Sequence, residues 1–214
     1  MTNFIPIFPL GIVVFPGENL NLHIFEPRYK QLINECWAEA KPFGIPAVIN
    51  NEVREFGTLV KVTEIVKVHD NGEMDIKTQG TSLFRILEII KSVPDRLYSG
   101  AIVNYPDNFL GTASTELMKK VVNAVRELHK LLKISKDFSK PDEELTAYNI
   151  AHHAGLSLDG EYELLKLLRE EQRQEYLKRH LSNVLPVIAQ METLKERVKL
   201  NGHFNNLSSF QFED

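Results

Sequence analysis

The 214-residue sequence is 43% apolar and 25% charged, as is typical of a globular protein, and its length suits one large domain or two small ones. The formal net charge of −4 argues against a broad nucleic-acid-binding surface, and the single cysteine excludes an intrachain disulfide and suits a reducing compartment. No apolar run approaches the roughly 18 residues of a membrane span, and the N-terminus lacks the basic residues of a signal peptide. We therefore expect a cytoplasmic protein with no membrane partner.

Residues 1–110 are dominated by short β-type runs. Asn71-Gly72 lies between two of these runs and is the dipeptide most typical of a tight β-hairpin. The apolar residues of 56–68 do not alternate strictly, which predicts a bend or a bulge in that strand. Six or more strands with few helices between them predict a curled, mostly antiparallel sheet or small barrel.

One helix, near residues 27–40, interrupts the strands. Pro27 suits its first position, because the missing N–H of proline costs nothing there, and Pro42 ends it. The expected apolar stripe of this helix consists of Tyr29, Leu32, Ile33, Cys36, Trp37 and Ala40.

Residues 111–200 change to helical periodicity, so we predict a helical bundle with a boundary near 105–112 and an overall α+β fold. One helix is expected from Thr112 to Ile134. Another is expected in SKPDEELTAYNIAHHAG, where Ser139 and Asp142 have capping-box spacing and Gly155 suits the C-terminal stop. A helix near 160–170 and a long final helix follow. Residues 201–214 have weak periodicity and are expected to form a C-terminal tail.

The common catalytic and metal-binding motifs are absent. The sequence has no phosphate-binding G-x-x-x-x-G-K-[ST] loop, no G-x-G-x-x-G, no G-x-S-x-G, no C-x-x-C and no H-x-x-x-H. His152 and His153 are neighbours on a helix and so point to different faces. Cys36 lies on an apolar helix face, where a free cysteine is usually a small core residue. We therefore predict no catalytic, cofactor-binding or metal-binding residues.

The stretch LNLHIFEPRYKQLINEC places His23, Glu26 and Arg28 at the junction between a strand and the helix near 27–40. The positive end of the helix dipole favours the Glu26 carboxylate, and Arg28 is placed to pair with Glu26 or with a neighbouring strand. We interpret this stretch as a structural joint, with contact to a partner as the alternative role, rather than as an active site.

The longer segment FPLGIVVFPGENLNLHIFEPRYKQLINEC resembles the opening of the N-terminal (LON) domain of ATP-dependent Lon proteases. The shared elements are F-P-L, V-x-F-P-G and I-F-E-P-R-Y. FGTLVKVTEI resembles the family's G-T-x-A-x-I strand, with Val60 in place of the usual small residue. IKTQGTSLFRILEI resembles its G-x-x-R-F-R-I hairpin, and HLSNVLP resembles part of its helical half. The resemblance covers residues 4–200.

The resemblance implies a PUA-like, curled β subdomain followed by a helical bundle, in a domain linked to substrate recognition and assembly. In Lon proteases the chemistry belongs to an ATPase module and to a peptidase module with a Ser-Lys dyad. Neither module follows in this sequence, so we expect a stand-alone LON-domain protein of bacterial type that is not an enzyme.

The function expected from this resemblance is binding of unfolded peptide segments or of a protein partner, as a recognition or adaptor protein in proteolysis. The binding route is either an apolar cleft between sheet and bundle or strand addition at a sheet edge. Phe25, Arg28, Tyr29 and Phe56 are the candidate contacts, since aromatic residues and arginine dominate interfaces. The alternative for each is core packing or an ion pair, and for Phe25 core packing is the favoured interpretation.

Two other functions stay open at this point. LON β subdomains look like RNA-binding PUA-type barrels, although the acidic balance and the lack of a basic stripe with interleaved aromatic residues argue against nucleic acid. A hydrolase is the third possibility, and the missing modules count against it. A dedicated partner could also engage the aromatic tail at Phe204, Phe210 and Phe212. The sequence does not indicate an oligomeric state.

Overall fold

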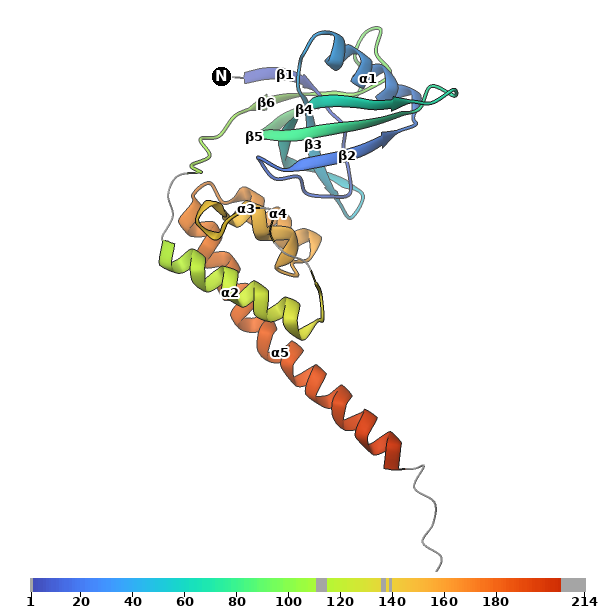
Figure 1. Ribbon diagram of the computed structural model, residues 1–214. Helices are drawn as coiled ribbons and strands as arrows, with labels where there is room; N and C mark the ends of the chain where they lie inside the picture. Colours follow the sequence, from blue (N-terminus) through green and yellow to red (C-terminus); the bar gives the residue numbers. More distant parts are fainter. Residues whose placement is uncertain (1, 111–114, 136–137, 139, 205–214) are drawn as a thin grey trace, which may run out of the picture.

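The computed structural model describes residues 2–110, 115–135, 138 and 140–204, with side-chain surroundings up to Lys199 (Figure 1). Its strands are β1 (Thr2–Pro6), β2 (Asn19–Ile24), β3 (Phe43–Ile49), β4 (Glu52–Val68), β5 (Met74–Ile90) and β6 (Gly100–Asn104). Its helices are α1 (Pro27–Ala38), α2 (Thr115–Leu131), α3 (Ala147–Ile150), α4 (Leu158–Lys166) and α5 (Glu170–Phe204), with 3₁₀ turns at Asp142–Glu144 and Ala151–His153. None of the helices in these ranges is long and apolar enough to cross a membrane.

The six strands form one antiparallel sheet in the order β1-β6-β5-β4-β3. β2 pairs with the first half of β5, in register from Asn19–Gln79 to Ile24–Met74. Isolated bridges from Ile7 to Gly44 and from Leu10 to Ala47 hold the segment after β1 beside β3, which lies at the other end of the strand order. The sheet is therefore curled, although β1 and β3 themselves do not pair to close it. The predicted α+β class with a curled antiparallel sheet is confirmed.

The long β4–β5 hairpin turns where the sequence predicts it. The Glu73 carbonyl accepts from the His69 N–H at 2.8 Å, and Gly72 has a φ of +75°, which glycine adopts without steric cost. The pairing register between β4 and β5 shifts at Val62/Glu64 and again at Ile65/Lys67. These irregularities confirm the predicted bulge.

Helix α1 begins at Pro27 and covers one end of the sheet. Its buried residues are Tyr29, Leu32, Ile33 and Cys36, which pack in one cluster with apolar residues of β2, β3, β4 and β5. The expected stripe was too long: Trp37 is 46% exposed, and the helix ends at Ala38 because Ala40 adopts a left-handed φ of 51°.

The helix predicted between Ser139 and Gly155 is broken into pieces, which corrects that expectation. Thr146 is extended (φ −113°, ψ 166°) and caps α3, with Asn149 completing the capping box. The cap therefore lies at Thr146 and not at the predicted start; Ser139 itself lies outside the described residues. Gly155, at φ +69°, ends the segment as predicted.

The largest apolar cluster joins the sheet to the helices. The Phe15 ring stacks on Tyr148 at 5.1 Å between centroids, and Val13, Ala47 and Leu83 pack into the same cluster as residues of α2 to α5. Side chains fill this part of the sheet–helix junction, and a binding cleft between sheet and bundle stays a prediction. Beyond Ile188, α5 extends away from the other helices with Met191, Leu194 and Val198 exposed (Figure 1).

Candidate functional site

The end of the sheet nearest the β4–β5 turn carries a mixed polar and aromatic surface. It is formed by the end of β2, the first turn of α1 and the hairpin itself. The Lys30 Nζ donates to the Asn71 carbonyl at 3.1 Å, which ties α1 to the turn. We call this the hairpin-end surface and define it by His23, Phe25, Arg28, His69 and Asp75.

Phe25 is the exposed aromatic residue of this surface. It lies between the last residue of β2 and the N-cap of α1, and it is 58% exposed. Its ring stacks beside the His23 imidazole at 6.2 Å between centroids. The core packing favoured by the sequence is therefore wrong for Phe25, because the strand-to-helix connection turns the ring outward.

Glu26 and Arg28 pair with each other, which is one of the contacts expected from the sequence, and their role as a structural joint stays a prediction. The Arg28 Nη2 and Nε lie 2.7 and 2.8 Å from the Glu26 Oε2. Glu26 is the N-cap of α1, but its carboxylate bonds Arg28 instead of the helix N–H groups. The Arg28 guanidinium lies 4.5 Å from the centre of the Tyr29 ring, and its side chain stays about half exposed.

The other two candidate contacts lie apart from this pair. Tyr29 is 7% exposed and stacks on Phe8 at 3.8 Å between centroids, so its ring is a core element. Phe56 lies at the opposite end of β4, where its N–H donates to the Tyr162 hydroxyl at 3.2 Å. The structure therefore brings Phe25 and Arg28 together but does not join Phe56 to them, and the binding role of all four stays a prediction.

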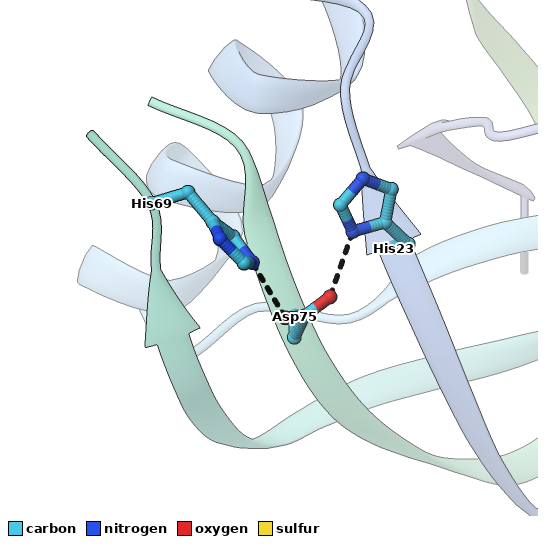
Figure 2. A group of neighbouring side chains, drawn as sticks. All are labelled: His23, His69 and Asp75. Carbon is cyan, nitrogen blue, oxygen red and sulfur yellow. Dashed lines mark hydrogen bonds and ion pairs between the residues drawn. The ribbon is translucent and has the colours of Figure 1, made fainter. Parts of the chain in front are cut away.

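Figure 2 shows a cluster of ligand-type side chains, His23, His69 and Asp75. The His23 ring of this cluster is the one that stacks beside Phe25. The Asp75 carboxylate lies between two imidazoles, with Oδ1 2.7 Å from the His23 Nδ1 and Oδ2 2.6 Å from the His69 Nε2. The second ring nitrogen of His23, Nε2, lies 3.2 Å from the Glu73 Oε2. His23 comes from β2, His69 and Glu73 from the hairpin turn, and Asp75 from β5.

These contacts shift the titration of the cluster. The hydrogen bond to the Asp75 carboxylate raises the pKa of His23, and the hydrogen bonds donated by His23 and His69 lower the pKa of Asp75. Sequence analysis missed the group because its members are far apart in the chain. The Asn71-Gly72 turn was a signal that His69 and Asp75 lie near each other, but nothing in the sequence set the register that places His23 opposite Asp75.

A second imidazole between two carboxylates links the sheet to the helices. The His152 Nδ1 lies 2.7 Å from the Glu161 Oε1, and its Nε2 lies 3.2 Å from the Glu18 Oε2. Hydrogen bonds to the carboxylate of Glu161, and then to that of Glu18, raise the pKa of His152 to about 10. Because Glu18 precedes β2 and Glu161 lies in α4, this charged contact holds the two parts of the fold together.

A cavity of about 250 Å³ lies between α2, the segment 142–146 and α5. The apolar part of its wall includes Met118, Val122 and Leu145, and its polar groups include Glu144 and Gln174. This cavity opens to solvent, is lined mainly by the helical part of the chain and differs from the sheet–bundle cleft expected from the sequence.

Comparisons with known proteins agree on one family. The family model described as the ATP-dependent protease La (LON) substrate-binding domain matches residues 5–183. A Lon protease from Flavobacterium johnsoniae is 28% identical over an alignment of 99 residues that covers 42% of this chain. The match covers only 12% of that relative's length.

Two solved structures share the fold. A Lon N-terminal domain protein from Xanthomonas campestris superposes with a TM-score of 0.63 at 23% identity, covering 82% of this chain and 96% of that one. The N-terminal domain of a Mycobacterium avium complex Lon protease superposes with a TM-score of 0.59 at 14% identity, covering 84% and 98%.

Proposed function

The chain belongs to the family of LON substrate-binding domains, and from this premise we propose that it is a non-catalytic module that binds unfolded polypeptide segments. The family match over residues 5–183 is the observation that carries the proposal. A recognition or adaptor role in proteolysis, in the cytoplasm, is part of the same proposal.

The hairpin-end surface is the binding site we propose. Within the described residues, β2 pairs with β5 along one edge and has no strand partner along the other. An extended peptide can add to such an edge through backbone hydrogen bonds, which place little demand on its sequence. Phe25, at the end of this strand, would then supply an exposed apolar contact for a side chain of the peptide.

The described side chains also support a role without covalent chemistry. Burial raises the pKa of the Cys36 thiol to about 12, so at neutral pH this cysteine holds its proton and is a poor nucleophile. The Arg28 guanidinium and the Glu26 carboxylate bond each other. We therefore assign ATP hydrolysis and peptide cleavage, as Lon proteases perform them, to other modules than this one.

The test is a titration of the purified chain against three fluorescent ligands without ATP: an unfolded apolar-rich peptide, a folded domain and a single-stranded RNA. We expect the anisotropy of the unfolded peptide alone to rise, with a dissociation constant that is micromolar or weaker, since ordering a flexible ligand costs entropy. Tight RNA binding with no peptide binding would replace the proposal with the RNA function. No binding to any of the three would favour a dedicated protein partner and would contradict peptide recognition.

A further inference from the structure

The cluster around Asp75 has more carboxylate contacts than neutral imidazoles can satisfy. A neutral imidazole carries one N–H, so it can donate to one acceptor only. Yet both ring nitrogens of His23 face carboxylate oxygens, Asp75 at 2.7 Å and Glu73 at 3.2 Å. The two contacts therefore need either one more proton than a neutral imidazole supplies or a cation bound between the side chains.

From this geometry we infer that His23, His69 and Asp75 form a binding site for a divalent transition-metal ion, and specifically for Zn²⁺. The His23 Nδ1, the His69 Nε2 and an Asp75 carboxylate oxygen all lie within 4.8 Å of one another. Figure 2 shows both imidazoles turned toward the carboxylate, from β2 on one side and the hairpin turn on the other.

The type of ligand selects the ion. Imidazole nitrogens suit zinc and its transition-metal neighbours, whereas Ca²⁺ and Mg²⁺ prefer sets made of oxygen. Two histidines and one carboxylate are a common three-ligand zinc set, which leaves a fourth position for water. Zinc–ligand bonds of about 2.0–2.2 Å place tetrahedral ligand atoms about 3.4 Å apart. The imidazole–carboxylate contacts of 2.7 and 2.6 Å are shorter than this, so the side chains need to move apart by less than about 1 Å to admit the ion. They are partly exposed, which permits that adjustment and gives the ion a path in.

Glu73 is placed to orient the first ligand. Its Oε2 faces the His23 Nε2 at 3.2 Å, on the far side of the ring from Asp75. If the Nε2–H of His23 donates a hydrogen bond to Glu73, the Nδ1 lone pair is free to bind the ion. A carboxylate behind a metal-binding histidine typically fixes its tautomer in this way and strengthens binding.

A bound ion would have a structural consequence for the sheet. The three ligands come from β2, from the hairpin turn and from β5, so the ion would join the end of β2 to the hairpin. This end is also where Phe25 lies, next to the His23 ring. Zinc binding does not depend on the proposed peptide binding and can be measured without any peptide.

The experiment is calorimetric titration of the full chain, stripped with EDTA and dialysed, with ZnCl₂. We expect one zinc ion per chain and a higher melting temperature with zinc. His23→Gln, His69→Gln and Asp75→Asn should each lower the affinity by ~10-fold or more, and Glu73→Gln by ~10-fold, as for other residues that orient zinc ligands. In parallel, Co²⁺ should give the intense visible absorption of a tetrahedral complex.

His152→Gln is the matched control, because His152 also lies between two carboxylates but at the other end of β2. Circular dichroism checks that every variant folds. Unchanged zinc affinity in both His23→Gln and His69→Gln would overturn the assignment. So would the absence of saturable binding to the wild-type chain, or a loss of binding confined to His152→Gln.

Discussion

The fully buried guanidinium of Arg173 bonds the nearly buried carboxylate of Glu170, with 2.9 Å between Arg173 Nε and Glu170 Oε2. The same guanidinium donates to the Tyr148 hydroxyl at 2.9 Å and to the carbonyls of Leu167 and Phe109 at 2.9 and 2.7 Å. Arg173 in α5 thus fixes α3 and the segment that follows β6. One side chain joins three parts of the chain that are distant in sequence.

We predict that Arg173→Met lowers the free energy of unfolding by ~3–5 kcal/mol, because it leaves the Glu170 carboxylate buried without its charged partner. Urea denaturation followed by circular dichroism measures this change. The matched control is Arg179→Met in the same helix, where Arg179 is mostly exposed and pairs with Glu175. Equal effects of the two substitutions would show that burial does not determine the stability contributed by this contact.

The Glu26–Arg28 contact should contribute much less to the free energy of unfolding than the Arg173–Glu170 contact does. Both side chains are more than a third exposed, and exposed ion pairs typically stabilise a protein by less than ~1 kcal/mol. We predict that Glu26→Ala and Arg28→Ala each lower the melting temperature slightly, and that the double variant loses less than the sum. If both single variants melt like the wild type and yet bind less peptide, the pair is a recognition element and not a structural joint.

The protein should become less stable as the pH rises through the range in which His152 loses its proton. The folded chain raises the pKa of His152 from 6.5 to about 10. The stabilisation that protonated His152 gives the folded state is therefore complete below about pH 6.5 and is lost as the pH rises toward 10. Between about pH 7 and 9 the melting temperature of the wild type should therefore decrease more steeply than that of His152→Gln. Parallel slopes for the two proteins would show that the folded state does not hold this proton.

The purified chain should hydrolyse neither ATP nor casein. The sequence has no phosphate-binding loop, and the thiol of its single cysteine is buried with a raised pKa. Phosphate release and fluorescent casein assays measure both activities. Turnover that a point substitution in this chain abolishes would refute the non-catalytic proposal, whereas turnover unchanged by substitution would indicate a contaminant.

Local signals predicted the local structure well. Pro27 fixed the start of α1, and Asn71-Gly72 fixed the hairpin turn, since both depend on the backbone preferences of one or two residues. The break at Thr146 was missed because Ser139 and Asp142 also have capping-box spacing, so the start of the helix was placed there and not at Thr146 and Asn149.

The sequence patterns could not predict contacts between segments that lie far apart in the chain. Whether Phe25 is buried depends on the path of the chain between β2 and α1, and its position in the sequence gave no sign of its 58% exposure. The cluster of His23, His69 and Asp75 depends on the register of β2 on β5, which long-range packing sets. A motif search finds metal ligands that are close in sequence, so it could not find this group.

Comparing Phe25→Ser with Phe109→Ser in the peptide anisotropy titration tests whether the hairpin-end surface binds unfolded polypeptide. Phe109 is a matched control, because it is 59% exposed, against 58% for Phe25, and precedes the helical part of the chain instead of adjoining the hairpin. We predict that Phe25→Ser weakens peptide binding by ~5-fold or more, as expected when an aromatic contact is lost, and that Phe109→Ser leaves it unchanged. Equal affinities of Phe25→Ser and the wild-type chain would contradict the claim.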